Sequence, residues 1–204
     1  LEVDGMYSLI RALQAAKESS FSLLIGSELT LDAGQFSRYQ SPKEPAKGWG
    51  LPKGWEDRGI RLPILTTSAQ GYRDLCHLMS EYTLTHDAQE SPAHGLGNIA
   101  QMGDIRILTG GSRGPLRRIL HAQGHTQADR FLKDLIALFG RERVLLESVL
   151  MPGQDDLGRE LAELAQANCL TLVASAAPVM AYPQSKYRAD LLCSLRQGRS
   201  LDDL

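Results

Sequence analysis

The strongest constraint on the fold is a repeated alternation between short apolar runs and amphipathic segments. Apolar residues recur at helical spacing from Met6 to Ala16, and residues 21–31 then form a compact apolar run typical of a strand. The same alternation predicts later strands over 61–67, 105–109, 144–150 and 170–176, and helices over 71–82, from Pro115, from Thr126, over 155–167 and over 185–196. Apolar strands that are each followed by an amphipathic helix predict a parallel sheet covered by helices. The five strands fit either an open doubly wound sheet or a barrel.

Two stretches interrupt this alternation. Residues 32–59 contain three prolines and five glycines, and residues 85–103 contain Ser91 and Pro92 together with three glycines. Glycine and proline at this density end helices and strands, so both stretches are predicted to be long surface loops. Trp49 and Trp55 of the first loop are expected to fold back onto the body. A chain of 204 residues can form one core, and we expect residues 1–204 to be a single domain.

Composition and charge exclude several classes of protein. The chain is 43% hydrophobic and 23% charged, with a formal net charge of -2, so it is not a polybasic nucleic-acid-binding protein. No apolar run approaches the roughly 18 residues of a membrane span, and no export leader opens the chain. The three cysteines are widely spaced and form no C-x-x-C. We therefore expect reduced thiols and a cytoplasmic protein.

Two glutamates occupy positions that suit chemistry. Glu28 follows the apolar run Leu23 to Ile25, and Glu147 lies within the strand predicted over 144–150. Parallel sheets and barrels place their functional groups at the carboxyl ends of strands, which makes both glutamates candidate metal ligands. The alternative for each is a carboxylate that faces solvent at the end of a strand.

The turn over residues 109–115 is a candidate anion site. It joins a predicted strand to a predicted helix and contains Gly110, Gly111 and Arg113, while Arg117 and Arg118 follow on the helix. Backbone N–H groups at a helix N-terminus and nearby arginines can bind an anion. The turn lacks the spacing of a P-loop and of a dinucleotide-binding turn. The alternative is an ordinary turn followed by a solvated basic helix face.

Seven segments, taken together and in order, resemble one known family. They are Asp4-Gly5-Met6-Tyr7, Ile25-Gly26-Ser27-Glu28-Leu29, Leu65 through Gly71-Tyr72-Arg73-Asp74-Leu75, Leu108-Thr109-Gly110, Val144 to Glu147, Leu172-Val173-Ala174-Ser175 and Asp190 through Leu201-Asp202-Asp203. This order resembles the N-terminal PHP domain (polymerase and histidinol phosphatase type) of C-family bacterial DNA polymerases. That family includes the alpha subunit of DNA polymerase III and its error-prone relatives. The resemblance covers nearly the whole chain.

The resemblance implies a distorted (β/α)7 barrel of the TIM-like type, with its first strand unit missing here. In the family, the carboxyl face of the barrel holds His, Asp, Glu and Cys ligands for zinc or manganese. Matched by position, Glu28 is retained and Glu2 stands roughly at an Asp position. The other matched ligand positions hold Arg61, Gly111, Ala177 and Val179. Glu28, Glu2 and Glu147 are therefore expected to be remnants of a metal site, and no bound cofactor is expected.

The expected function follows from this resemblance. The chain would be a catalytically degenerate PHP domain of a DNA polymerase III alpha-type subunit, serving as a structural and interaction platform in DNA replication or translesion repair. Its partners would be the polymerase domains of the same parent chain and other replisome or repair subunits, with weak DNA contact and no membrane contact. The nucleotidyltransferase chemistry would lie after Leu204. The alternative is an active metal-dependent phosphoesterase or 3′-5′ proofreading exonuclease whose remaining ligands precede Leu1.

Overall fold

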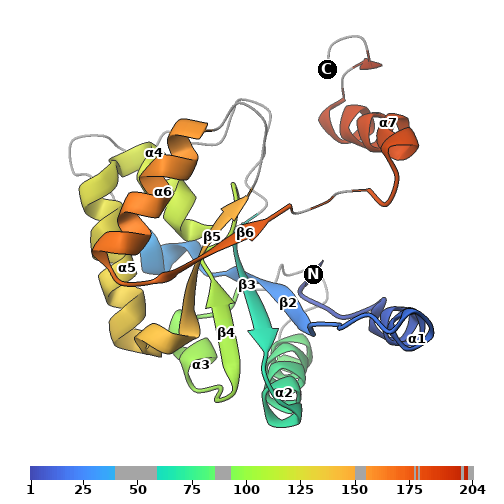
Figure 1. Cartoon of the computed structure of the whole chain (residues 1–204), viewed down its shortest axis with the longest axis horizontal. Coiled ribbons are helices and arrows are strands. Elements are labelled where there is room, and N and C mark those ends of the chain that lie inside the picture. Colours follow the sequence, from blue (N-terminus) through green and yellow to red (C-terminus); the bar gives the residue numbers. More distant parts are fainter. Residues whose placement is uncertain are drawn as a thin grey trace.

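The structure is a computed structural model that describes residues 1–39, 59–85, 93–149, 155–176, 178, 180–198 and 200–201. Its centre is one six-stranded sheet with the strands in sequence order (Figure 1). The strands are β1 (Glu2–Val3), β2 (Gly26–Leu31), β3 (Ile60–Thr66), β4 (Ile105–Leu108), β5 (Val144–Val149) and β6 (Thr171–Ser175). Within the described residues, β1 and β6 are the outer strands of this sheet. The chain is therefore an α/β protein, and β1 is a strand that the sequence pattern did not reveal.

The sheet is mixed, so the prediction of a parallel sheet is wrong for one strand. β3 pairs antiparallel with both β2 and β4, whereas β1 with β2, β4 with β5 and β5 with β6 are parallel. The backbone N–H of Thr67, just after β3, donates to the carbonyl of Asp104, just before β4, at 2.8 Å. The chain between β3 and β4 thus returns to the edge that it left. One helix after each strand predicts a crossover to a parallel neighbour, but two helices lie between these strands and reverse the direction.

Most helices cover one side of the sheet or its lower edge (Figure 1). They are α1 (Leu9–Ser19), α2 (Ala69–Thr85), α3 (Leu96–Ala100), α4 (Pro115–Gln123), α5 (His125–Phe139), α6 (Asp155–Ala167) and α7 (Lys186–Gln197). α4 starts with Pro115 at its first position and stops at Gly124, whose φ of +78° suits glycine. The same glycine leads into α5, so α4 and α5 form a helical hairpin.

The core lies between the sheet and α4, α5 and α6. Alternate strand residues face it, and all are nearly inaccessible to solvent: Leu29, Leu31, Ile60, Leu62, Ile64, Ile105, Ile107, Val144 and Leu146. Their helical partners include Leu116, Ile119, Phe131, Leu135, Leu161 and Leu164. Each fully buried side chain of this size contributes about 1.5–3 kcal/mol. Because one face of each strand packs into this core, polar side chains are left on the opposite face.

The two predicted loops contain more structure than expected. The first begins with a 3-10 helix, η1 (Ala33–Tyr39), whose Phe36 and Tyr39 are buried against Phe131 of α5 at ring-centroid distances of 5.9 and 5.3 Å. The second contains α3 and a parallel bridge between Leu31 and His94. The glycine content of these segments predicted loops. In each segment, however, two apolar residues three positions apart are buried, and this burial stabilises a short helix. Trp49 and Trp55 lie outside the described residues.

Helices α1 and α7 lie apart from this core (Figure 1). α1 has no buried residue, and both helices expose large apolar side chains such as Ile10 and Leu195. The sheet is thus packed against helices on one side. In contrast, α1 and α7 leave large apolar side chains exposed to solvent. Within the described part of the chain, no helix is long and apolar enough to cross a membrane.

Candidate functional site

The strand register brings Glu28, Arg61 and Glu147 to one face of the sheet. Arg61 pairs with Thr30, so it lies on the same face as Glu28, two residues earlier on β2. Following the pairings from β3 through β4 to β5 places Leu108, Leu145 and hence Glu147 on that face as well. It is the face opposite the buried core. The structure therefore brings together two of the three predicted acidic residues and an arginine.

Arg61 is placed there by the reversed direction of β3. Because β3 runs antiparallel to its neighbours, its first residues lie beside the last residues of β2 and β4. The backbone N–H of Arg61 donates to the carbonyl of Arg113 at 2.9 Å, which fixes the start of β3 to the turn after β4. The guanidinium Nη1 then lies 3.7 Å from Oε2 of Glu28. The Arg61 side chain is 16% exposed and that of Glu28 34%, so water screens this ion pair only in part.

Glu147 is buried beside this pair. The residue is 7% exposed, and its backbone N–H donates to Oγ1 of Thr109 at 3.0 Å. Its Oε2 is buried with no hydrogen-bond partner among the described residues. Burial raises the pKa of the Glu147 carboxyl and the negative charge of Glu28 raises it further, while a hydrogen bond with Ser175 acts in the opposite direction. Burial is thus the main influence on this carboxyl, which lies on the same face of the sheet as the Arg61–Glu28 ion pair.

Glu2 does not join the cluster. Val3, not Glu2, pairs with Glu28, so the alternation of side chains sends Glu2 to the other face. Its two carboxylate oxygens accept the backbone N–H of Ser8 at 3.1 and 3.0 Å, before the start of α1. This hydrogen bond lowers the pKa of the Glu2 carboxyl. The position of Glu2 gives it a role in the turn into α1.

Asp4 is a further acidic residue beside β2, and the sequence analysis did not identify it as a candidate. Its φ of +47° is unusual for a residue other than glycine, and its carboxylate accepts Thr30 N–H at 2.7 Å and Thr30 Oγ1–H at 2.5 Å. Nε2 of the buried His94 lies 3.9 Å from Oδ1 of Asp4. The Asp-Gly pair at residues 4 and 5 was the available signal, since this dipeptide is typical of turns. Asp4 ties β1 to the carboxyl end of β2.

The candidate anion turn adjoins the same edge of the sheet. Gly110 has a φ of +78°, and a Cβ on Gly111 would lie 2.8 Å from Cγ2 of Val149, so both glycines are sterically required here. Arg118 is 3% exposed, and its Nη2 donates to the carbonyl of Gly59 at 3.0 Å. Arg117 is half-buried, and that burial lowers the pKa of its guanidinium. Arg113 and Arg117 thus keep some solvent contact, while Arg118 holds the segment that leads into β3.

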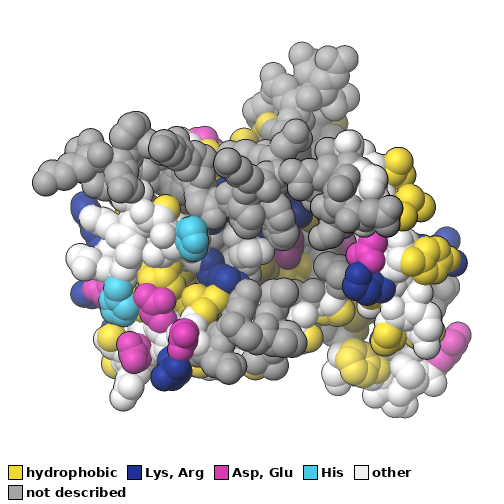
Figure 2. All heavy atoms as spheres, turned by 90° about the horizontal axis from the view of Figure 1, so that it is seen from above, with side chains coloured by type: hydrophobic (Ala, Val, Ile, Leu, Met, Phe, Trp, Pro, Cys, Tyr) yellow, Lys and Arg dark blue, Asp and Glu magenta, His cyan; other side chains and the backbone are white. Residues whose placement is uncertain are grey.

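Charged side chains do not form a single patch on the face seen from above. Figure 2 shows basic and acidic side chains interspersed in its described part, with apolar side chains grouped toward the end of the molecule where α1 and α7 lie. A mixed pattern of this kind gives little long-range attraction for a polyanion. On the described part of this face, the charges therefore give no extended basic surface.

A mixed sheet with helices packed on it, and with two glutamates and an arginine on one face of its strands, defines an α/β protein with a polar cluster on its sheet. Within that class, the chain belongs to the PHP domain family, because the family model described as PHP domain matches residues 2–149.

Error-prone DNA polymerases are among the curated proteins that this chain is similar to. The protein from Cutibacterium acnes is 31% identical over 206 residues, which cover 98% of this chain and 17% of that protein. Those from Mycolicibacterium paratuberculosis and Nocardia farcinica are 29% and 28% identical, again over 98% of this chain and over 17% and 20% of their own lengths. The chain thus spans about a fifth or less of these relatives.

The residues present do not fit the metal cluster that the family resemblance implied. A cation bound by Glu28 and Glu147 would lie beside the guanidinium of Arg61, which carries the same sign of charge. Among the described residues, no three His, Cys, Asp or Glu side chains converge well enough to hold a metal ion. Gly111 offers no side chain, and Ala177 and Val179 lie outside the described residues. The positive charge on this face of the sheet is that of Arg61, which pairs with Glu28.

Proposed function

We propose that this chain is the PHP domain of an error-prone-type C-family DNA polymerase, and that it acts as a structural and interaction platform without metal-dependent catalysis of its own. The parent protein would work in replication or translesion repair in the cytoplasm. The observation that carries the proposal is the Arg61–Glu28 ion pair, 3.7 Å across β2 and β3. An internal guanidinium occupies the place where a catalytic domain would need a cation bound by several ligands.

The surroundings of Glu147 support the same conclusion. Its Oε2 is buried with no hydrogen-bond partner among the described residues, and burial raises the pKa of its carboxyl. The Arg61–Glu28 ion pair lies on the same face of the sheet. We assign these three side chains to holding the sheet together.

The exposed apolar surface of α1 and α7 supports the platform role. Tyr7, Ile10 and Leu195 are 83%, 67% and 70% exposed. Large apolar side chains grouped in this way mark surfaces that contact other protein. We assign them to packing against the polymerase domains of the parent chain. In that setting we also propose that the six-stranded sheet is part of the distorted (β/α)7 barrel expected from the resemblance.

The proposal is tested by assaying the chain for 3′-5′ exonuclease and phosphoesterase activity in the presence of manganese or zinc. We expect no metal-dependent release of nucleotides from a labelled 3′ end. The matched control is Glu28→Ala, which removes the retained acidic residue. Metal-dependent activity that Glu28→Ala abolishes would overturn the proposal and favour an active proofreading domain. Activity that is equal in both chains would not depend on Glu28. It would be assigned to a contaminating nuclease and would not count against the proposal.

A further inference from the structure

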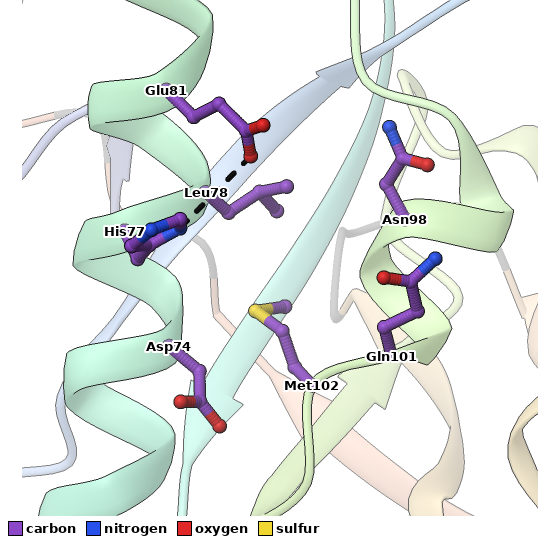
Figure 3. Close-up of a pocket in the computed structure, with 7 residues that line it drawn as sticks. All are labelled: Asp74, His77, Leu78, Glu81, Asn98, Gln101 and Met102. Carbon is purple, nitrogen blue, oxygen red and sulfur yellow. Dashed lines mark ion pairs between the residues drawn. The ribbon is translucent and has the colours of Figure 1, made fainter.

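A separate pocket of about 340 Å³ lies between α2 and α3 (Figure 3). Helix α2 contributes Asp74, His77, Leu78 and Glu81, and the α3 side contributes Asn98, Gln101 and Met102. Figure 3 shows the two groups of side chains facing one another across the gap. The volume lies at the lower end of the range for ligand pockets, large enough for one side chain but small for a nucleotide.

The lining combines an apolar floor with acidic and amide groups. Leu78 and Met102 are buried, whereas Glu81, Asn98 and Gln101 are exposed around them. Among the described residues, no lysine or arginine lines the pocket. Within the described part of the chain, neither Asp74 nor Glu81 forms an ion pair with a lysine or arginine; Oδ1 of Asp74 accepts Gln70 Nε2–H at 2.6 Å, and Glu81 lies 3.9 Å from His77 Nδ1. In this part of the chain the two carboxylates of the pocket thus have no lysine or arginine partner, and His77 is the basic side chain beside Glu81.

We propose that this pocket binds an arginine side chain of a protein partner. The three methylenes of arginine would lie on Leu78 and Met102, as long basic side chains commonly cover apolar surface. The guanidinium has five N–H donors in a plane, and the carboxylates of Asp74 and Glu81 with the amide oxygens of Asn98 and Gln101 supply acceptors on both sides. Lysine offers the same charge without this planar set of donors.

The acidic lining also selects against other occupants. Two carboxylates repel a phosphate, so nucleic acid is not the ligand of this pocket. The amides of Asn98 and Gln101 can both donate and accept, which lets them bind the peptide groups beside the inserted side chain. Charge complementarity therefore points to a basic segment of protein.

This site is independent of the Arg61 cluster. α2 begins where β3 ends, while Arg61 lies at the start of β3, so the pocket and the cluster are at opposite edges of the sheet. If arginine does not bind in the pocket, the proposed role of the Arg61–Glu28 ion pair is unaffected. Metal-dependent activity at Glu28 would equally leave the pocket unchanged. The experiment below therefore fails or succeeds separately from the test of the proposed function.

The test is a titration of the ¹⁵N-labelled chain with N-acetyl-L-arginine amide, followed by two-dimensional NMR. The side-chain NH₂ signals of Asn98 and Gln101 report on the pocket and are assigned with Asn98→Ala and Gln101→Ala. N-acetyl-L-citrulline amide is the matched probe, because it has nearly the same shape and no charge. The chain Asp74→Asn/Glu81→Gln removes both carboxylates, and Glu18→Gln/Glu142→Gln removes two exposed carboxylates elsewhere.

We expect saturable shifts of both amide signals with the arginine probe, and shifts smaller by roughly fivefold or more with the citrulline probe. The Asp74→Asn/Glu81→Gln chain should lose most of the response, and the Glu18→Gln/Glu142→Gln chain should keep it. Backbone spectra of both variants show whether each remains folded. Equal shifts with both probes, or an unchanged response in the folded Asp74→Asn/Glu81→Gln chain, would overturn the proposal. N-acetyl-L-lysine amide serves as a third probe, and tighter binding of this probe than of the arginine probe would overturn the choice of arginine.

Discussion

The guanidinium of Arg61 lies 3.7 Å from the carboxylate of Glu28, and the two residues belong to strands that run in opposite directions. A parallel β3 would place its first residues at the other edge of the sheet, away from Glu28. The antiparallel direction of β3 is therefore what makes the ion pair possible. It also puts Arg61 on the same face of the sheet as the buried Glu147.

The Arg61–Glu28 pair is expected to contribute to stability as a coupled unit. Arg61→Met should lower the free energy of unfolding by about 1–3 kcal/mol, because it leaves the partly buried carboxylate of Glu28 without its ion-pair partner. Glu28→Gln should cost less. A double-mutant cycle by urea unfolding should give a coupling energy of about 1 kcal/mol. The exposed Arg159–Asp156 pair on α6 is the control, with coupling near zero expected. Additive effects at Arg61 and Glu28 would show that the contact is incidental.

Glu147 should make stability depend on pH in a defined direction. Burial raises the pKa of the Glu147 carboxyl above its ordinary value in the folded chain, so between the unfolded and folded pKa values the folded state binds more protons. Stability should therefore fall as the pH rises from about 4.5 through the folded pKa, and the penalty then stays constant. Glu147→Gln should remove this fall. The measurement is the difference in urea midpoint between wild type and variant from pH 4.5 to 8, with Glu142→Gln as an exposed control. A difference that does not change with pH would contradict the assignment.

The buried phenol of Tyr39 should stabilise the packing of η1 on α5. Its hydroxyl donates to Oδ2 of Asp134 at 2.6 Å, and burial together with Asp134 raises the pKa of Tyr39 to about 12. Tyr39→Phe keeps the ring against Phe131 and removes only this hydrogen bond, so a loss of about 1 kcal/mol is expected. Tyr7→Phe, at an exposed tyrosine, should have no measurable effect. Equal stability of the Tyr39→Phe chain and wild type in urea unfolding would show that the hydrogen bond adds nothing.

The turn over residues 109–115 is expected to bind single-stranded DNA weakly at most. Arg113 and Arg117 flank the N-terminus of α4, but the chain has a net charge of -2 and mixed charges around the turn. A few phosphate contacts give a shallow dependence of affinity on salt. Fluorescence titrations at two ionic strengths should show weak, salt-sensitive binding that falls further in Arg113→Ala/Arg117→Ala. Tight binding at high salt, or binding unchanged in the variant, would place the contact surface elsewhere.

The sequence predicted much of the fold, because periodicity reports burial directly. The segments that became β3, β4, β5, β6, α2, α4, α5, α6 and α7 were all expected as such elements. Strand direction could not be predicted in the same way. It depends on the hydrogen bond between Thr67 and Asp104 and on two helices between β3 and β4, which are contacts between residues far apart in sequence. η1 and α3 were missed because glycine-rich composition outweighed the apolar pairs that bury them.

The candidate site was only partly predictable for a related reason. Glu28 and Glu147 were chosen by their position near strand ends, and the register brings them to one face. Glu2 was chosen by its match to a ligand position of the family that the chain resembles, but the alternation of side chains on a two-residue strand sends it to Ser8 instead. Arg61 was noted as a replaced ligand position. Its pairing with Glu28 required the direction of β3, which the sequence pattern left undetermined.

Our central proposal is that Arg61 takes the position of a cation beside the carboxylates on this face of the sheet. Elemental analysis of the purified chain, dialysed after incubation with zinc or manganese, tests this most directly. We predict far less than one equivalent of either metal per chain, and no change in Glu28→Gln. About one or more equivalents retained through dialysis, and lost in Glu28→Gln, would contradict the account, because a site with several converging ligands keeps its metal through a binding free energy on the order of 10 kcal/mol.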